Sequence, residues 1–308
     1  MALLFKSGSS RTPWWVEEFK RQAPALDVRL WPEAGNPDDI EFALVWLPEP
    51  GEMKRYKNLK AIFSLGAGVD HLFKDPNLPR LPITRVVDIN LTRRMTEYVV
   101  CQVLRHHRQQ PAYEEQQRRA HWGELKQPAA DQRTVGIMGL GVLGADAAEK
   151  LVALGFNVVG WSRTRKSVPG VKSFAGPGEM AAFLGQSEIL VCLLPLTKET
   201  ENILDAKAFA ALPKGASFVN VARGQHVVDE ALLAALDSGH ASHATLDVFR
   251  KEPLPSDHPY WRRRAVTITP HCASYTDPRT VISQVIENMR RTKAGEPLMH
   301  TVDMDLGY

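Results

Sequence analysis

Residues 135–144 read VGIMGLGVLG, and this stretch decides the fold of the chain. An apolar run typical of a buried strand leads directly into glycines at positions 139, 141 and 144, and a helical pattern follows. Gly139 permits a tight turn, Gly141 lets the backbone approach an anion, and Gly144 allows the helix to pack closely on the strand. Because a helix N-terminus also offers free N–H groups, this order predicts a dinucleotide-binding turn. The alternative is a glycine-rich turn that binds nothing.

Apolar runs alternate with helix-like segments on both sides of this turn. The runs expected as strands are Leu3–Lys6, Ala43–Leu47, Ala61–Leu65 and Ile83–Val87 before it, and Val135–Met138, Asn157–Trp161, Glu188–Leu193, Ser217–Val221, His243–Val248 and Val266–Thr269 from it onward. Such alternation predicts an α/β fold with parallel sheets. We therefore expect two doubly wound parallel-sheet domains, a Rossmann nucleotide-binding domain and a smaller, flavodoxin-like domain.

Two long helices set the predicted domain boundaries. One runs from Thr96 to about Trp122, and Pro111 must kink or divide it. The other, Pro278–Ala294, is amphipathic, and we place it back on the first domain. The prediction is therefore a discontinuous first domain over 1–97 and 276–308, and a nucleotide-binding domain over 98–275.

The composition is that of an ordinary globular protein. The 308 residues are 44% hydrophobic and 24% charged, with a net charge of +3, so neither disorder nor a fibre is expected. No apolar run approaches the roughly 20 residues of a membrane-spanning helix, and the N-terminus shows no cleavage-site pattern. Cys101, Cys192 and Cys272 are widely spaced, without a CxxC pair. They predict reduced thiols in a cytoplasmic protein rather than disulfides or a zinc site, and no metal is expected.

Basic residues gather between His106 and Arg119, but Glu114 and Glu115 nearly offset them. Nucleic-acid binding usually needs Lys and Arg concentrated on one face. We interpret this segment as a solvated or dimer-forming face and expect no nucleic-acid partner.

The strand after the glycine turn ends in WSRTRK (161–166). An NAD site usually carries an acid about 20 residues beyond the glycines, where it binds the ribose 2′-hydroxyl, and this segment has none. Arg163 can pair with a 2′-phosphate through two hydrogen bonds, and Ser162 and Thr164 add donors. The segment predicts NADPH in preference to NADH, with Arg165 as a further contact or a solvated charge.

Three later strand ends each carry a charged or titratable side chain. Arg223 lies in VNVARG (219–224), Glu252 in DVFRKEPLP (247–255), and His271 follows a proline in TITPHCAS (267–274). Ligands bind outside the carboxyl ends of strands in open α/β sheets. Alone, Arg223 could be a surface charge, Glu252 a helix cap and His271 a structural histidine. Together, after a dinucleotide turn, they predict a catalytic site.

In order and spacing, these motifs resemble the D-isomer-specific 2-hydroxyacid dehydrogenases, and most of all their glyoxylate/hydroxypyruvate reductase branch. The resemblance extends from Ser64 to Ser274 and implies NADPH-dependent reduction of a small 2-keto acid. His271 would donate the proton to the carbonyl oxygen, and Glu252 would orient the imidazole and favour its charged form. Arg223 would hold the substrate carboxylate and polarise the keto oxygen. The hydride would come from NADPH, so no metal is needed.

The resemblance also implies that the first domain binds the substrate. Backbone N–H groups of Ala67 and Gly68 would bind the substrate carboxylate. Trp46 resembles the aromatic wall of the glyoxylate reductase branch, but it could equally be core. Arg279 would reach the substrate or merely begin the last helix, and His71 is expected to pack or cap locally.

The resemblance adds cofactor contacts to the glycines and the 162–165 segment, and it makes 98–275 the NADP-binding domain. These contacts are Val142, Leu143, Leu194, Pro195, Val221, Ala222 and Asp247. Asp247 would lie near the nicotinamide carboxamide or only cap its strand. The chain departs from the family pattern at Cys272, where an aliphatic residue is usual, and in lacking the acid after the second strand.

Other functions of the same fold stay open. Relatives that act as NADP(H)-binding regulators or redox sensors keep the same catalytic residues. Two other enzymes of the family are not expected, because a phosphoglycerate dehydrogenase usually carries an added regulatory domain and a formate dehydrogenase would lack the Glu–His pair. The resemblance further implies a homodimer formed through the long helix.

Overall fold

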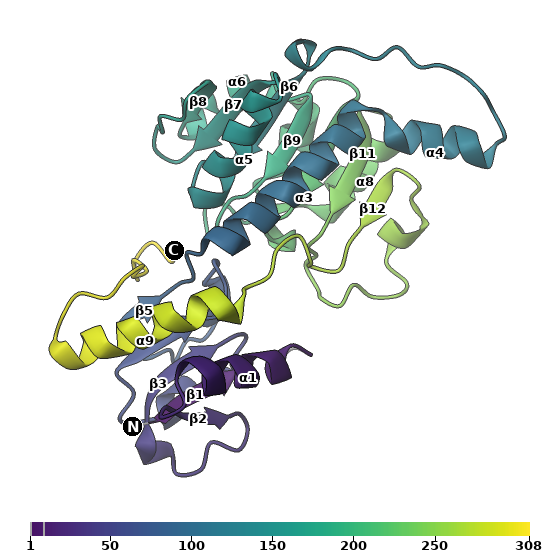
Figure 1. Cartoon of the computed structure of the whole chain (residues 1–308). Helices are drawn as coiled ribbons and strands as arrows, with labels where there is room; N and C mark the ends of the chain where they lie inside the picture. The colour runs from purple at the N-terminus through teal and green to yellow at the C-terminus, as the bar shows by residue number, and fades with distance from the viewer. Residues whose placement is uncertain (1, 9) are drawn as a thin grey trace. The chain divides into compact units, whose positions relative to one another are not determined.

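A computed structural model of the chain describes residues 2–8 and 10–308, which divide into two compact units (Figure 1). The small unit comprises Met1–Leu91 and Tyr275–Tyr308, and the large unit comprises Thr92–Ser274. The chain thus leaves the small unit once and returns to it once. The assignment of one unit to substrate and the other to cofactor stays a prediction.

The small unit is built on a five-stranded parallel sheet in the order β2-β1-β3-β4-β5. Its elements are β1 (Ala2–Lys6), α1 (Thr12–Gln22), β2 (Asp27–Leu30), β3 (Ile40–Val45), β4 (Ala61–Ser64), α2 (Asp70–Phe73), β5 (Ile83–Thr84) and α9 (Pro278–Ala294). This strand order is the flavodoxin-like one, so the predicted fold of this part is confirmed.

Helix α9 has the predicted bounds and packs beside α1 (Figure 1). The carboxylate of Asp277 accepts a hydrogen bond from the Arg279 N–H at 3.0 Å and so caps its N-terminus. Gly295, with φ +70°, ends it in the left-handed conformation that glycine adopts easily. The side-chain amide of Gln22, at the end of α1, lies 3.4 Å from the carbonyl oxygen of Pro278.

The large unit is built on a seven-stranded parallel sheet in the order β12-β11-β10-β9-β6-β7-β8. Its strands are β6 (Thr134–Met138), β7 (Asn157–Ser162), β8 (Val171–Ala175), β9 (Ile189–Cys192), β10 (Ala216–Asn220), β11 (Ala241–Leu246) and β12 (Val266–Ile268). Its helices are α4 (Gln110–Arg118), α5 (Val142–Ala153), α6 (Met180–Leu184), α7 (Ala206–Ala210) and α8 (Asp229–Asp237), together with α3 (Ile89–His107), which begins in the last residues of the small unit.

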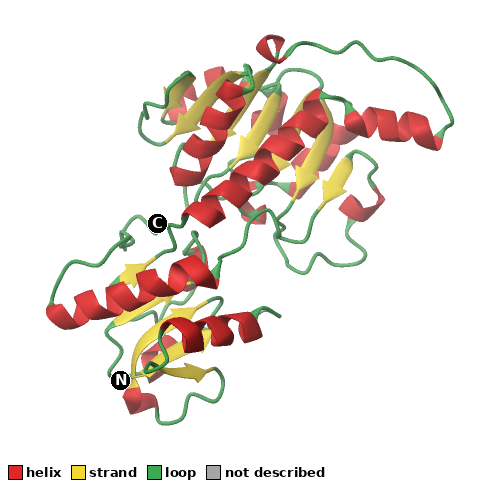
Figure 2. Cartoon of the chain, in the orientation of Figure 1, coloured by secondary structure: helices red, strands yellow, loops and turns green. Residues whose placement is uncertain are grey.

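Helices lie on both faces of this sheet (Figure 2). One buried cluster joins the sheet to α3 and α5, and a second joins it to α6, α7 and α8. The strand order reverses between β6 and β9, which is the switch point where doubly wound sheets bind ligands. The predicted Rossmann domain is therefore confirmed.

The structure contains two strands, β2 and β8, that the sequence analysis does not predict. Each lies at the edge of its sheet, and most of their side chains are half-buried or exposed. An edge strand is covered incompletely, so it needs no continuous apolar run and leaves a weak signal in the sequence.

The long helix is divided as Pro111 predicts, but it begins earlier than expected. Helix α3 starts at Ile89 rather than Thr96, and the Asp88 carboxylate accepts a hydrogen bond from the Leu91 N–H at 2.9 Å near its start. The chain then turns at Gln109, which has φ +56°, and α4 begins with Pro111 in its first turn.

None of the helices in the described part of the chain has the length and apolar character needed to cross a membrane. Nor do residues 2–8 and 10–308 bring together three His, Cys, Asp or Glu side chains placed to hold a metal ion.

Candidate active site

Parallel pairing brings the three predicted catalytic segments to one edge of the large sheet. Asn220 at the end of β10 is in register with Leu246 of β11, and Leu246 is in register with Ile268 of β12. The segments that carry Arg223, Glu252 and His271 therefore leave the sheet from the same carboxyl edge.

His271 and Glu252 form a direct pair at this edge. The distance from Nδ1 of His271 to Oε2 of Glu252 is 2.7 Å, and each side chain is 35% exposed. The Phe249 N–H donates to the other carboxylate oxygen of Glu252 at 2.9 Å. An ionised carboxylate only accepts hydrogen bonds, so the proton of this contact belongs to Nδ1. Nε2 of His271 makes no hydrogen bond within the described residues, which leaves it able to meet a ligand.

Glu252 is held in its ionised form. Burial raises the pKa of this carboxyl, whereas the hydrogen bonds from His271 and Phe249 lower it. The positive charges of His271 and Arg223 act in the same direction, and together they hold the pKa of Glu252 below its ordinary value. The carboxylate is therefore available to orient the imidazole throughout the neutral pH range.

The backbone of His271 is in the left-handed region, with φ +51°. This conformation is uncommon for a residue other than glycine and persists only where neighbouring contacts hold it. The carbonyl oxygen of Asp247 accepts from the His271 N–H at 2.8 Å. The Asp247 carboxylate accepts from the N–H groups of Cys272 and Ala273, both at 2.9 Å. Asp247 thus caps the segment that carries His271, while its expected contact with the nicotinamide carboxamide stays a prediction.

Arg223, just after β10, is held by hydrogen bonds to two neighbouring residues. The side-chain amide of Asn220 donates to the Arg223 carbonyl at 2.9 Å, and the guanidinium donates to the carbonyl of Ala222 at 2.7 Å. A Cβ on the next residue, Gly224, would overlap the backbone of Phe249. The Arg223 and Glu252 segments are therefore in direct backbone contact.

His226 ties this segment to a further strand end. Its ring is fully buried, with Nδ1 at 3.1 Å from the Arg223 carbonyl and Nε2 at 3.2 Å from the Pro195 carbonyl. No motif in the sequence marks this histidine, because its role depends on a segment that lies far away along the chain. The one signal for His226 in the sequence is its position shortly after the predicted catalytic Arg223.

The glycine turn after β6 has the geometry that a dinucleotide needs. Gly139 has φ +104°, and a Cβ there would meet the backbone of Leu193. A Cβ on Gly144 would overlap the carbonyl oxygen of Gly139, whereas a Cβ on Gly141 would meet no atom within 4 Å. The turn is thus tightly packed on the protein side and open at Gly141. The first N–H groups of α5, which begins at Val142, have no intrahelical acceptors and can bind a phosphate.

The segment after β7 carries Arg163 and Arg165, and the two side chains have different surroundings. Ser162 is buried and its hydroxyl donates to the Thr164 carbonyl at 2.8 Å, whereas Arg163 is exposed. The Arg165 guanidinium pairs with the Glu179 carboxylate at 2.6 Å. The contact of either arginine with a 2′-phosphate stays a prediction.

The remaining predicted cofactor contacts lie at the ends of β9 and β10. The side chains of Leu194, Val221 and Ala222 are buried in the core, whereas Pro195 is exposed. A cofactor contact at the buried positions would therefore involve the backbone.

In the small unit, the Gly66–Gly68 segment is held by Ser64 and His71. The Ser64 hydroxyl accepts from the Gly66 N–H at 3.2 Å and donates to the Gly68 carbonyl at 3.1 Å. His71 is buried, with Nε2 at 3.1 Å from that hydroxyl, and its Nδ1 accepts from the Leu47 N–H at 3.2 Å. The expected local capping by His71 is confirmed, and this capping shapes the segment that carries Ala67.

Trp46 lies just after β3 and is half-buried, with its ring 4.4 Å from that of His71. Arg279 pairs with the buried Asp277 carboxylate at 2.7 Å, and its guanidinium lies 5.6 Å from the ring centroid of Trp14. The carboxylate of Asp277 offsets the unfavourable position of an arginine at a helix N-terminus. Contacts of Trp46 and Arg279 with a substrate stay predictions.

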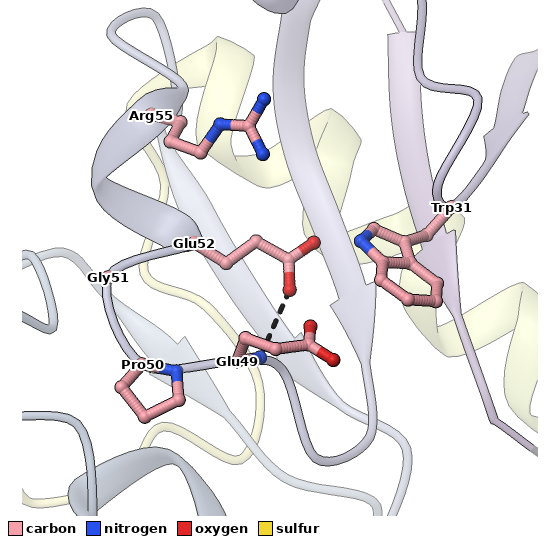
Figure 3. Close-up of a pocket in the computed structure, with 6 residues that line it drawn as sticks. All are labelled: Trp31, Glu49, Pro50, Gly51, Glu52 and Arg55. Atoms are coloured by element: carbon pink, nitrogen blue, oxygen red, sulfur yellow. Dashed lines mark hydrogen bonds between the residues drawn. The ribbon is translucent and has the colours of Figure 1, made fainter.

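The small unit contains a cavity of about 300 Å³ (Figure 3). It is lined by Trp31, Glu49, Pro50, Gly51, Glu52 and Arg55. None of these is a predicted site residue, so the candidate site rests on side-chain geometry and not on the shape of a cavity.

Comparison with known proteins identifies the family of this chain. Residues 100–273 match the NAD binding domain of the D-isomer specific 2-hydroxyacid dehydrogenases, which is more than half of the chain. The chain belongs to this enzyme family. The predicted family resemblance is therefore confirmed.

Solved structures of relatives match over nearly the whole chain. A D-isomer specific 2-hydroxyacid dehydrogenase from Xanthobacter autotrophicus Py2, solved with NADPH and MES, is 45% identical, with a TM-score of 0.95 over 100% of this chain and 99% of its own. An NADPH-dependent glyoxylate/hydroxypyruvate reductase from Sinorhizobium meliloti, solved with NADP and sulfate, is 40% identical, with a TM-score of 0.93 over 100% of both chains. A probable 2-hydroxyacid dehydrogenase from Rhizobium etli CFN 42, solved with NADP, HEPES and L(+)-tartaric acid, is 39% identical, with a TM-score of 0.90 over 100% of this chain and 99% of its own.

The lowered pKa of Glu252 predicts how its contribution to stability varies with pH. A carboxyl whose pKa is lower in the folded than in the unfolded chain stabilises the fold at pH values above its ordinary pKa, about 4.3. This stabilisation is lost as the pH falls through the pKa of the folded chain. We expect Glu252→Gln to lower Tm at neutral pH, and the difference from the unchanged protein to close in acid. Thermal unfolding of both proteins from neutral to acidic pH measures this difference in Tm. A difference that stays constant or widens in acid would contradict the account.

Proposed function

We propose that this chain is a cytoplasmic reductase that uses NADPH to convert a small 2-keto acid, glyoxylate or hydroxypyruvate, to the 2-hydroxy acid. The observation that carries the proposal is the 2.7 Å contact between Glu252 and Nδ1 of His271, with Nε2 of His271 left for the substrate. In the described part of the chain Cys101, Cys192 and Cys272 form no disulfide, which suits a reducing compartment.

The residues of the large unit supply the proton and the positive charge that this reaction needs. His271, protonated and oriented by Glu252, would donate from Nε2 to the carbonyl oxygen of the substrate. Arg223 would bind the carboxylate and stabilise the negative charge that develops on that oxygen. In the small unit, backbone N–H groups of Ala67 and Gly68 would bind a carboxylate, and Trp46 and Arg279 would be further substrate contacts.

The glycine turn fits NADPH, which would supply the hydride. Gly141 leaves room for the pyrophosphate, and the N-terminus of α5 faces it with N–H groups. Arg163, with Ser162 and Thr164, would bind the 2′-phosphate. Further contacts would come from Leu194, Pro195, Val221, Ala222 and Asp247.

Turnover tests the reaction and the proton donor together. We expect the protein to oxidise NADPH with glyoxylate or hydroxypyruvate, and more slowly with pyruvate. His271→Ala should lower kcat by about 10²–10⁴-fold, because it removes the general acid, while the affinity for NADPH is retained.

The control is NADPH binding, followed by fluorescence in both proteins. Tight NADPH binding without turnover of any of the three acids would instead favour a regulatory or redox-sensing NADP(H)-binding protein. Equal activity of His271→Ala would remove this histidine from the mechanism.

Cofactor preference is tested at Arg163. Charge-assisted hydrogen bonds contribute about 1.5–3 kcal/mol, so Arg163→Ala should raise KM for NADPH by about 10–100-fold. KM for NADH should change little, because NADH has no 2′-phosphate. Lys166→Ala, which removes a neighbouring exposed charge, is the matched control. Equal losses with both cofactors would show that Arg163 does not contact the 2′-phosphate.

We further propose that the chain forms a homodimer through the long helix and the segment that follows it. Helix α4 extends away from the sheet of the large unit and continues into a long loop (Figure 1). Trp122, in this loop, is fully exposed. A large aromatic side chain presented in this way is typical of a protein–protein contact.

Light scattering should give a particle of twice 34.4 kDa at micromolar concentration. Trp122→Ala should shift the particle toward the monomer, whereas Trp261→Ala, which removes another exposed indole of the large unit, should not. A 34.4 kDa species from the unchanged protein would contradict the dimer.

A further inference from the structure

A chain of hydrogen bonds connects α3 to the segment that carries His271. The Tyr98 hydroxyl lies 2.6 Å from the Thr269 hydroxyl, which in turn lies 2.6 Å from the Asp247 carboxylate. Asp247 is buried, and Tyr98 and Thr269 are half-buried. These side chains come from α3, from the end of β12 and from the end of β11, so the connection joins three parts of the large unit.

The proton of each contact can be assigned from the chemistry of the groups. The Asp247 carboxylate only accepts, so the single hydroxyl proton of Thr269 points toward it. The Thr269 oxygen can then only accept from Tyr98, which makes Tyr98 the donor. Burial raises the pKa of the Tyr98 phenol, so it keeps this proton at physiological pH. The order of donation is thus Tyr98 to Thr269 to Asp247.

The chain ends on the backbone of the proposed proton donor. Asp247 accepts from Thr269 and Cys272 through one carboxylate oxygen and from Ala273 through the other, and its carbonyl accepts from the His271 N–H. These contacts hold His271 in its left-handed conformation, which is otherwise unfavourable. The loss of one hydroxyl would leave the Asp247 carboxylate free to tilt, and the backbone of residues 271–273 would tilt with it.

The same contacts lie where the chain enters and leaves the large unit. Thr92 is its first residue and Ser274 its last. Tyr98 lies on the second turn of the chain inside this unit, and Thr269 shortly before its exit. The Tyr98–Thr269 hydrogen bond therefore ties the incoming helix to the outgoing segment.

We propose that Tyr98 and Thr269 are positioning residues for His271, which act by holding the Asp247 carboxylate against the backbone of residues 271–273. This role rests on the proposed function, because it concerns the proton donor of that reaction. Neither residue would touch the substrate or the cofactor. Both act through the orientation of the imidazole.

A pair of substitutions at Thr269 separates positioning from simple stability. Thr269→Val keeps the shape and removes the hydroxyl, whereas Thr269→Ser keeps the hydroxyl. Since a displacement of about 1 Å can lower a rate by about 10²-fold, we expect Thr269→Val to lower kcat with glyoxylate by about tenfold or more. Thr269→Ser should restore most of it. KM for NADPH should change less than kcat in Thr269→Val, because a tilt of Asp247 would also reach the cofactor contact proposed for this residue.

Tyr98→Phe removes the donor at the other end and should lower kcat in the same direction. Because the two residues act in one chain, the double variant Tyr98→Phe/Thr269→Val should be no slower than Thr269→Val alone. A fall in Tm with kcat unchanged in Thr269→Val would overturn the proposal, as would equal losses in the Val and Ser variants.

A second readout does not need turnover. The NMR signals of the His271 ring, assigned with His271→Asn, should shift in Thr269→Val and Tyr98→Phe and return in Thr269→Ser. Unchanged ring signals in Thr269→Val would overturn the positioning role. If the unchanged protein reduces none of the keto acids, the proposed function fails, but these signals still decide whether Thr269 positions His271.

Discussion

The candidate site depends on the parallel pairing of β10, β11 and β12. Parallel strands present all their carboxyl ends at one edge, and the register of these three strands makes them end almost level. Residues that are far apart along the chain, Arg223, Glu252 and His271, are thereby gathered at one edge of one sheet. A slip of one residue in this register would turn each buried side chain of the slipped strand to the opposite face. Strand β10, in which every residue is buried, opposes such a slip most strongly.

Contacts between the loops then convert this proximity into a defined geometry. Gly224 lies against the backbone of Phe249, and the Phe249 N–H in turn holds Glu252. Asp247 holds the backbone on either side of the His271 ring. The three charged groups are therefore not independent, and a change in one loop is transmitted to the others through the backbone. This arrangement suits a site in which the proton donor and the positive charge must act on the same small substrate.

The features that could be predicted from the sequence are those encoded locally. The glycine turn follows from its own residues, because a tight turn, an open approach and close packing each need glycine at a particular position. The strand ends that carry Arg223, Glu252 and His271 follow from buried strands and from the rule that ligands bind at carboxyl edges. The early start of α3 also has a local cause at Asp88, but without the folded chain its apolar pattern alone points to a later start.

The features that could not be predicted depend on contacts between distant segments. Most side chains of the edge strands β2 and β8 are half-buried or exposed, so hydrophobic patterning does not mark these strands. Asp247 could be recognised as a strand-end residue, but the direction of its carboxylate depends on where the backbone of residues 271–273 lies. The pairing of Arg165 with Glu179 likewise depends on how β7 and β8 are placed side by side. In each case the residue type is visible in the sequence and the partner is not.

The return of the chain to the small unit has a consequence for folding during synthesis. Strands β1 to β5 leave the ribosome first, but α9, which packs beside α1, is among the last elements to be made. The whole of Thr92–Ser274 emerges between them and can fold as a complete unit in the meantime. Although it begins the chain, the small unit is thus the last to be completed, and until α9 arrives the apolar surface that it covers stays open to solvent or to a chaperone.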